Sequence, residues 1–292
     1  MQSEFIELNG NAFFLRRWGD PALPRLLLLH GFPEYGGAWD DIAAHLKARF
    51  HCIAPDQRGF GQSWAPDDVS AYTTSNLVED MATLIAATGD GPVTLFGHDW
   101  GAAVAYGLAM FKPQLVERLI IANGVHPAPF QRALAAGGAQ SAASQYILYL
   151  RAEGSETWMA ADNFARMEAF FRAKMTTDWL TPDRLDSYRR EWARPGRLKT
   201  MIHWYRASPL AVATPGKPLT NLTPLPLDRL RVTCPHVLLW GEADRALLPE
   251  ATEGLEYFCD DLTRATFPDC DHWLLHQRPA EIARVLFEWL DR

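Results

Sequence analysis

The segment Gly97-His98-Asp99-Trp100-Gly101 follows directly on the apolar run Pro92-Val93-Thr94-Leu95-Phe96. It matches the G-x-S-x-G turn, which ends a strand, begins a helix and lifts its central side chain clear, except that aspartate replaces serine. A carboxylate that attacks an acyl group gives an anhydride, whereas attack on a strained or activated sp3 carbon gives an alkyl ester that water can cleave. The substitution therefore predicts a covalent nucleophile at Asp99 whose substrates are epoxides or alkyl halides.

Cleavage of such an ester requires a general base for the attacking water. His272 is the candidate, because it lies in a loop after the last strand-like run. Asp244 follows the preceding strand-like run and is the candidate acid that orients the imidazole, in the chain order nucleophile, acid, histidine. Glu242 and Asp271 are the local alternatives. Another version of this arrangement places the acid near Asn123, which carries no charge.

The oxyanion that forms when water attacks the ester needs two backbone donors. One is predicted to be the N–H of Trp100, the residue after the nucleophile. The other is expected in His30-Gly31-Phe32-Pro33, which follows a leucine-rich run, and Phe32 is the predicted donor. Gly31 allows close backbone approach, and Pro33 is a candidate for a cis peptide bond.

Opening an epoxide also requires an acid, because the ring oxygen would otherwise leave as a strong base. Tyrosine suits this role, since its ordinary pKa lies near roughly 10. Tyr146 and Tyr205 are the predicted pair. Tyr149 lies three residues after Tyr146 and is expected to share its helix face. Aromatic residues in such a region also commonly pack against substrate or core.

Short apolar runs alternate with helical patterns along the chain, which predicts an α/β fold with a mostly parallel open sheet and helices on both faces. The expected strands are 25–30, 51–55, 92–96, 119–122, 236–240 and 263–267, and the expected helices include 75–88, 101–111 and 280–290. Polar residues just past the ends of such strands form the site.

The alternation stops between Val125 and Leu230, where only helical patterns rich in aromatic residues occur. A proline-rich stretch closes this interval, with Pro215, Pro218, Pro224 and Pro226. Because the sheet pattern then resumes, we expect an inserted helical cap over residues 125–230. The core domain would then comprise residues 1–124 and 231–292.

Composition and charge argue against several classes of protein. The 292 residues carry a net charge of −7 without a dominant Lys/Arg block, which argues against nucleic acid as a partner. The four cysteines show no metal spacing and no disulfide framework. No signal peptide is visible, and no apolar run approaches the roughly 18 residues that a membrane helix needs. We expect a cytoplasmic protein; its oligomeric state does not follow from the sequence.

The chain resembles the α/β-hydrolase-fold epoxide hydrolases over nearly its whole length. The matching segments are His30-Gly31-Phe32-Pro33-Glu34, Asp56 through Ser63, Gly97 through Gly101, Asn123 through Pro127, Trp204-Tyr205-Arg206 and Asp271-His272-Trp273. The resemblance implies Asp99 as nucleophile, His272 as base, Asp244 as acid, and Tyr146 with Tyr205 as ring-opening donors. The resemblance further implies a reaction that needs no cofactor or metal and yields a vicinal diol.

Three other functions are compatible with this fold besides an epoxide hydrolase. Haloacetate dehalogenases carry arginines shortly after the nucleophile, and residues 100–104 contain none. Haloalkane dehalogenases usually place Asn where Phe32 stands, although Trp100 could serve a halide, so this reading is the runner-up. A catalytically silent ligand-binding scaffold is the third. Cap side chains predict a pocket for a small apolar or aromatic epoxide, namely Trp158, Met159, Phe164, Met167, Phe170 and Phe171.

Overall fold

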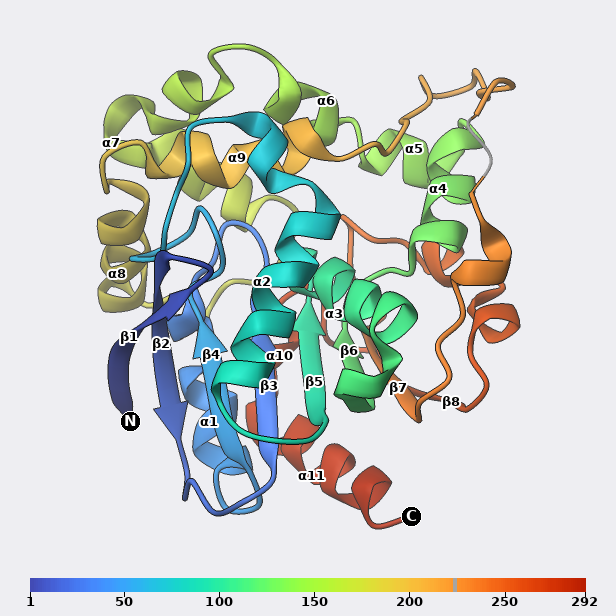
Figure 1. Ribbon diagram of the computed structural model, residues 1–292. Helices are drawn as coiled ribbons and strands as arrows, with labels where there is room; N and C mark the ends of the chain where they lie inside the picture. Colours follow the sequence, from blue (N-terminus) through green and yellow to red (C-terminus); the bar gives the residue numbers. More distant parts are fainter. Residues whose placement is uncertain (223–224) are drawn as a thin grey trace.

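The computed structural model describes residues 1–222 and 225–292. Their eight strands form one sheet in the order β1-β2-β4-β3-β5-β6-β7-β8 (Figure 1). The strands β1 and β2 pair antiparallel and β2 pairs antiparallel with β4, whereas β3 to β8 are parallel. The strand bounds are β1 Gln2–Leu8, β2 Asn11–Trp18, β3 Arg25–Leu29, β4 His51–Pro55, β5 Val93–His98, β6 Val116–Ala122, β7 His236–Gly241 and β8 Leu262–Phe267.

Helices cover both faces of the sheet. One face carries α2 (Thr74–Ala87) and α3 (Trp100–Phe111), and the other carries α1 (Asp40–Leu46) and α11 (Pro279–Leu290). Because β4, β5 and β7 are buried at every residue, their sequences are mostly apolar rather than alternating. The neighbours Leu95 and Phe96 belong to separate cores, since successive side chains of a strand point to opposite faces.

Between β6 and β7 the chain forms an inserted helical cap. Figure 1 shows its helices gathered beyond the end of the sheet at which β5 points. They are α4 (Pro127–Ala135), α5 (Ala139–Ala143), α6 (Tyr146–Arg151), α7 (Ser155–Arg172), α8 (Pro182–Trp192) and α9 (Arg197–Ala207), with α10 (Leu274–Gln277) following in the core. The predicted fold class, including the inserted cap, is confirmed. Pro224, of the proline-rich stretch, lies outside the described residues.

The structure differs from the sequence prediction at the N-terminal end of the chain. The hairpin of β1 and β2 was not expected, because β1 is exposed at its first four residues and so lacks the buried apolar run that marks the other strands. The elbow strand is also longer than the predicted 92–96. It continues to His98, so the first two residues of the turn motif belong to β5.

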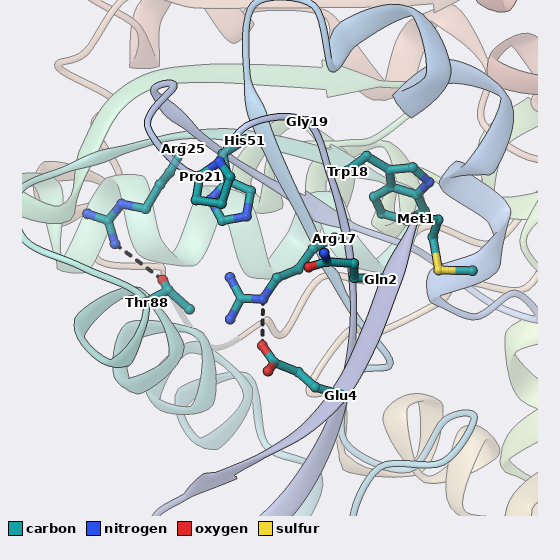
Figure 2. A pocket seen from close by; sticks show the side chains of 10 residues that line it. All are labelled: Met1, Gln2, Glu4, Arg17, Trp18, Gly19, Pro21, Arg25, His51 and Thr88. Carbon is teal, nitrogen blue, oxygen red and sulfur yellow. Dashed lines mark hydrogen bonds and ion pairs between the residues drawn. The ribbon is translucent and has the colours of Figure 1, made fainter.

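A polar hollow of about 520 Å³ lies beside the N-terminal hairpin (Figure 2). Its lining includes Arg25 and His51, the first residues of β3 and β4. In parallel strands, the first residues lie at one end of the sheet and the last residues at the other. This hollow is therefore remote from the end of the sheet where the cap lies. Within the described ranges, no helix combines the length and apolarity of a membrane span, and no group of three His, Cys, Asp or Glu side chains suits a metal ion.

Candidate active site

Asp99 stands at the sharp turn between β5 and α3. Its backbone has φ 50° and ψ −121°, a left-handed conformation that is strained for a residue with a side chain. Two glycines make the turn possible. A β carbon at Gly97 would lie 2.7 Å from the carbonyl oxygen of Gly101, and one at Gly101 would overlap the carbonyl oxygen of Leu29. The crowding explains the glycine spacing of the motif, and the turn places the carboxylate at the carboxyl edge of the sheet.

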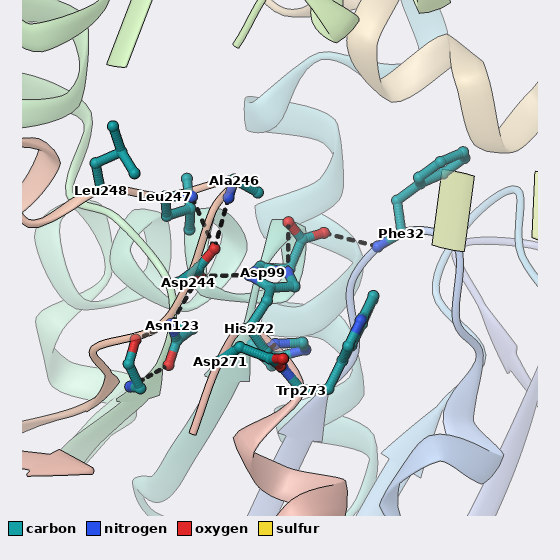
Figure 3. A network of polar contacts seen from close by, with 12 residues as sticks. Phe32, Asp99, Asn123, Asp244, Ala246, Leu247, Leu248, Asp271, His272 and Trp273 are labelled. Atoms are coloured by element: carbon teal, nitrogen blue, oxygen red, sulfur yellow. Dashed lines mark hydrogen bonds and ion pairs between the residues drawn. The ribbon is translucent and has the colours of Figure 1, made fainter. Parts of the chain in front are cut away.

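His272 lies between two carboxylates (Figure 3). Its Nδ1 is 2.8 Å from Oδ2 of Asp244, and its Nε2 is 3.6 Å from Oδ2 of Asp99. All three side chains come from segments just past strand ends, and Asp244 and His272 are buried. The structure therefore brings together the predicted nucleophile, acid and base.

The two alternative acids take other positions. Glu242 is exposed. Asp271 accepts hydrogen bonds from the backbone N–H of Thr176 at 2.5 Å and of Trp273 at 3.0 Å, so its oxygens are engaged away from the imidazole. Of the three carboxylates considered from sequence, Asp244 is the one in hydrogen-bond contact with His272.

Asn123 supports the acid, a role that sequence reasoning missed. Its Nδ2 donates to Oδ2 of Asp244 at 2.7 Å, and its Oδ1 accepts from the N–H of Gly241 at 2.7 Å. The other oxygen of Asp244 accepts from Ala246 N and Leu247 N at 2.7 and 2.9 Å (Figure 3). The sequence signal that could have revealed this role is the position of Asn123 just past β6, where another version of the fold carries the acid.

The charges of this group shift its pKa values in opposite directions. Burial would raise the pKa of Asp99, but the hydrogen bond and charge of His272 lower it below the ordinary 3.8. Burial would lower the pKa of His272, but the charge and hydrogen bond of Asp244, followed by those of Asp99, raise it well above 6.5. The resting site therefore favours a carboxylate nucleophile beside an imidazolium.

The predicted oxyanion donors flank the nucleophile. The N–H of Phe32 donates to Oδ1 of Asp99 at 2.7 Å. A β carbon at Gly31 would overlap the Asp99 side chain, so only glycine allows this approach. Trp100 begins α3, and its N–H belongs to the first turn, where a helix leaves its donors unpaired. The predicted cis bond before Pro33 is present.

Tyr146 and Tyr205 enter the site from different cap helices, α6 and α9. Their ring centroids lie 6.1 Å apart in a T-shaped arrangement, and both side chains line cavities together with Asp99. Burial, followed by nearby charges including that of Asp99, raises the pKa of each phenol above its ordinary value of 10. Both groups therefore remain protonated, as a proton donor must.

The expectation that Tyr149 shares a helix face with Tyr146 agrees with the structure, because both side chains line one surface groove. Tyr149 is 76% exposed and does not line the Asp99 cavities in the described chain. Tyr146 thus borders both this groove and the Asp99 cavities, whereas Tyr149 borders the groove.

Two cavities meet at Asp99, Tyr146 and Tyr205. One has a volume of about 200 Å³ and reaches Phe170, Phe171 and Trp273. The other has about 300 Å³ and is lined almost entirely by apolar side chains. Of the other cap residues expected in the pocket, Trp158 and Met159 line a surface groove that shares Tyr146 and Phe170 with the smaller cavity. Met167 packs in the core, and Phe164 packs against it.

A buried polar cluster beneath the site also escaped sequence reasoning. Oε1 of Glu34 accepts from the Tyr188 hydroxyl and lies by His276 Nε2, both at 2.7 Å, while Oε2 lies 3.3 Å from His98 Nδ1. Nε2 of His98 in turn lies 2.9 Å from the backbone oxygen of His272. Burial would raise the pKa of Glu34, but His276 and then His98 hold it well below 4.5.

Known proteins share the fold of this chain. Residues 24–279 match the family described as alpha/beta hydrolase fold. A solved structure from work on novel epoxide hydrolases of the alpha/beta hydrolases superfamily, from metagenomes of hot environments, is 35% identical; the match covers 99% of this chain and 98% of that one, with a TM-score of 0.90. The epoxide hydrolase of Bacillus megaterium, solved with an inhibitor, is 27% identical, with coverages of 99% and 100% and a TM-score of 0.88.

Sequence relatives agree with this grouping. Epoxide hydrolase 4 of Mus musculus is 28% identical, over 98% of this chain and 78% of the relative. The AB hydrolase superfamily protein YfhM of Bacillus subtilis is also 28% identical, over 99% and 98%. Because the family match spans most of the chain and a relative 35% identical is aligned nearly end to end, the chain belongs to the α/β hydrolase fold and, within it, to the epoxide hydrolase family.

Proposed function

We propose that the protein hydrolyses epoxides to vicinal diols through a covalent ester on Asp99. The N–H of Phe32 occupies Oδ1 of Asp99, which leaves Oδ2 as the attacking oxygen. Oδ2 displaces the ring oxygen from one epoxide carbon, so that a C–O bond to Asp99 forms while the ring C–O bond breaks. The elbow fixes the carboxylate at the cavity wall and thereby supplies the orientation that such a displacement needs.

The released oxygen takes a proton from the cap tyrosines. Tyr146 and Tyr205 line both cavities at Asp99, and their raised pKa values keep them protonated before the ring opens. Their hydroxyls donate to the ring oxygen as its negative charge develops, and one of them transfers its proton. In this proposal the cap spans residues 125–230 and contributes the acid, while the core contributes the nucleophile and the base.

Ester formation then switches the role of His272. Once Asp99 is an uncharged ester, it no longer raises the pKa of the imidazole. His272 can then pass its proton through solvent to the tyrosinate left by ring opening, and act as a base. His272 takes a proton from water, the hydroxide oxygen adds to the Asp99 carbonyl carbon, and the N–H groups of Phe32 and Trp100 stabilise the oxyanion. As this intermediate collapses and the ester bond breaks, the leaving alkoxide takes the proton of the added hydroxyl, so that the diol is released, Asp99 returns as a carboxylate and His272 is again an imidazolium.

The observation that carries this proposal is the pairing of one nucleophile with two phenols in a single cavity. Displacement of a halide needs no proton donor, whereas ring opening does. Trp100 also lines the larger cavity and could donate to a halide, which keeps a haloalkane dehalogenase as the second candidate. Halide release from short haloalkanes, measured beside diol formation from styrene oxide, separates the two activities. The Tyr205→Phe variant is expected to lose epoxide opening and to spare any halide displacement.

A single turnover in heavy-oxygen water tests the covalent route. Since water attacks the Asp99 carbonyl carbon, one labelled oxygen is expected in the Asp99 carboxylate by peptide mass analysis. Label found only in the diol would exclude the ester. The His272→Gln variant is expected to accumulate the alkyl-enzyme, because it retains the nucleophile and loses the base. An absence of diol from a panel of epoxides would instead favour a non-catalytic scaffold.

A further inference from the structure

The two cavities that meet at Asp99 differ in chemical character. The larger is lined by apolar side chains from the core and cap, among them Met110, Phe111, Phe130, Leu230 and Leu247. The smaller also has aromatic walls but includes two cations, Lys174 and Arg245. An epoxide bound at Asp99 between Tyr146 and Tyr205 therefore has an apolar space on one side and a cationic space on the other.

Lys174 is held on a strained turn that is anchored to the catalytic segment. The residue lies between α7 and α8 with φ 61°, a conformation that favours glycine or asparagine over lysine. The adjacent backbone is fixed from both directions. Thr176 N donates to Asp271 at 2.5 Å, and Gln277 Nε2 donates to the Thr176 carbonyl at 3.0 Å. The turn is thereby tied to residues 271–277, which include the base His272, and strain retained beside a site is typical of functional positions.

Arg245 is held by the catalytic acid itself. It lies between Asp244 and Ala246, and Oδ1 of Asp244 accepts from the N–H groups of Ala246 and Leu247 at 2.7 and 2.9 Å (Figure 3). This side-chain-to-backbone turn directs the chain back on itself directly after the acid. Arg245 is exposed, as is Lys174. One turn is thus bonded to Asp271 and Gln277, on either side of His272 in the chain, and the other to Asp244, and each presents an exposed cation to the smaller cavity.

Within residues 1–222 and 225–292, neither cation is matched by a protein carboxylate. Among the described residues, none of the ion pairs involves Lys174 or Arg245. Asp99 is the one carboxylate among the lining residues, and it is paired with His272. The chain as a whole carries a net charge of −7, so it repels anions except where cations are concentrated.

We infer that Lys174 and Arg245 determine specificity by binding an anionic substituent, a carboxylate, on the epoxide substrate. This inference rests on the proposed epoxide chemistry and adds a substrate class to it. The substrate is amphiphilic: its apolar substituent occupies the larger cavity, and its carboxylate lies at the opening of the smaller one. The guanidinium binds the carboxylate through paired N–H donors, while the lysine contributes a compact charge. A neutral epoxide of the same shape lacks this attraction.

Matched substrates test the inference. We compare an epoxide that bears a terminal carboxylate with its methyl ester, using kcat/KM for the wild type and for Lys174→Gln, Arg245→Gln and the double variant. The acid is expected to be the better substrate of the wild type. Because the cations are exposed, each single variant should lower kcat/KM for the acid roughly threefold and the double variant about tenfold, with little change for the ester. The preference for the acid should also weaken as salt is added.

Lys47→Gln is the matched control, because it removes one exposed positive charge from a residue that lines neither cavity. It is expected to leave the acid-to-ester ratio unchanged. The inference is overturned if the double variant retains the wild-type ratio of kcat/KM for acid to kcat/KM for ester, whether both values stay unchanged or both fall equally.

A binding measurement separates this inference from the catalytic proposal. Calorimetry with the diol acid, the product of the carboxylate substrate, needs no turnover. Weaker binding of the diol acid to the double variant, with unchanged binding of the diol ester, supports the anion site even if no epoxide is turned over. If the double variant binds the diol acid and the diol ester as tightly as the wild type does, the inference is refuted even if every epoxide tested is hydrolysed.

Discussion

Asn123 and His272 meet on a single oxygen of Asp244. The amide Nδ2 of Asn123 lies 2.7 Å from this oxygen and the imidazole Nδ1 lies 2.8 Å from it. Asn123 follows β6, Asp244 follows β7, and these two strands are neighbours in the sheet. The position of the acid therefore depends on an uncharged residue that also pairs with the backbone of Gly241 at the end of β7.

The Asn123→Ala variant should be less stable and slower in its second chemical step. The substitution leaves the Gly241 N–H without its acceptor and removes one donor from Asp244, so the free energy of unfolding should fall by about 1–3 kcal/mol. Because Asp244 orients the base, breakdown of the alkyl-enzyme should slow more than its formation. Denaturant unfolding and single-turnover kinetics measure the two effects.

Asn76→Ala is the control for that substitution, since Asn76 makes one exposed side-chain hydrogen bond, to the Ser70 carbonyl at 3.2 Å. Its effect on unfolding should stay within about 0.5 kcal/mol. Equal slowing of both chemical steps in Asn123→Ala would show that the residue does not act through the base.

The Gly31→Ala variant should disable the nucleophile without removing any polar group. A β carbon at this position would overlap the side chain of Asp99, so the carboxylate must move away from the Phe32 N–H. A displacement of about 1 Å is expected to lower kcat/KM roughly 100-fold. At Gly138 the nearest atom to an added β carbon is Oε1 of Glu250 at 3.9 Å, so Gly138→Ala should leave activity intact. Wild-type formation of the alkyl-enzyme in Gly31→Ala would contradict the steric explanation.

The Asp99→Asn variant mimics the loss of charge on ester formation and should lower the pKa of His272. Asp99 raises this pKa in the resting site through its charge and hydrogen bond, and Asp244 raises it more. We therefore expect a lower pKa in Asp99→Asn than in the wild type, and a larger decrease in Asp244→Asn. Nuclear magnetic resonance titration of the imidazole gives the values. A His272 pKa that does not change in Asp99→Asn would rule out the proposed switch from imidazolium to base.

Stability should depend on Glu34 in a pH-sensitive manner. The folded-state pKa of Glu34 lies well below 4.5, so ionised Glu34 stabilises the fold above the unfolded-state pKa, and this contribution disappears as the pH falls through the folded-state value. Glu34→Gln should therefore cost about 3 kcal/mol at neutral pH and progressively less in acid. Urea unfolding over the pH range tests this. Glu4→Gln, which removes an exposed partner of Arg17, should cost less than about 1 kcal/mol.

The candidate site and the fold were predictable from the sequence to different extents. Asp99, Asp244 and His272 could be placed together because each follows a strand-like run, and parallel strands end at one edge of a sheet. The β1–β2 hairpin was missed because its exposed first strand carries no apolar signal. The contacts of Glu34 with Tyr188 and His276 were missed because these partners lie 154 and 242 positions away, and no local pattern marks such pairs. Asn123 was noticed only for its missing charge.

The position of Glu34 has a consequence for how this enzyme family can be recombined. Its carboxylate belongs to the core, yet one of its donors, the hydroxyl of Tyr188, belongs to the cap helix α8. A chimera that joins this core to the cap of a relative inherits a buried anion and must supply a hydroxyl at the same place. Cap and core are consequently not interchangeable parts, and a cap graft designed for a new substrate range should retain the tyrosine that closes this contact.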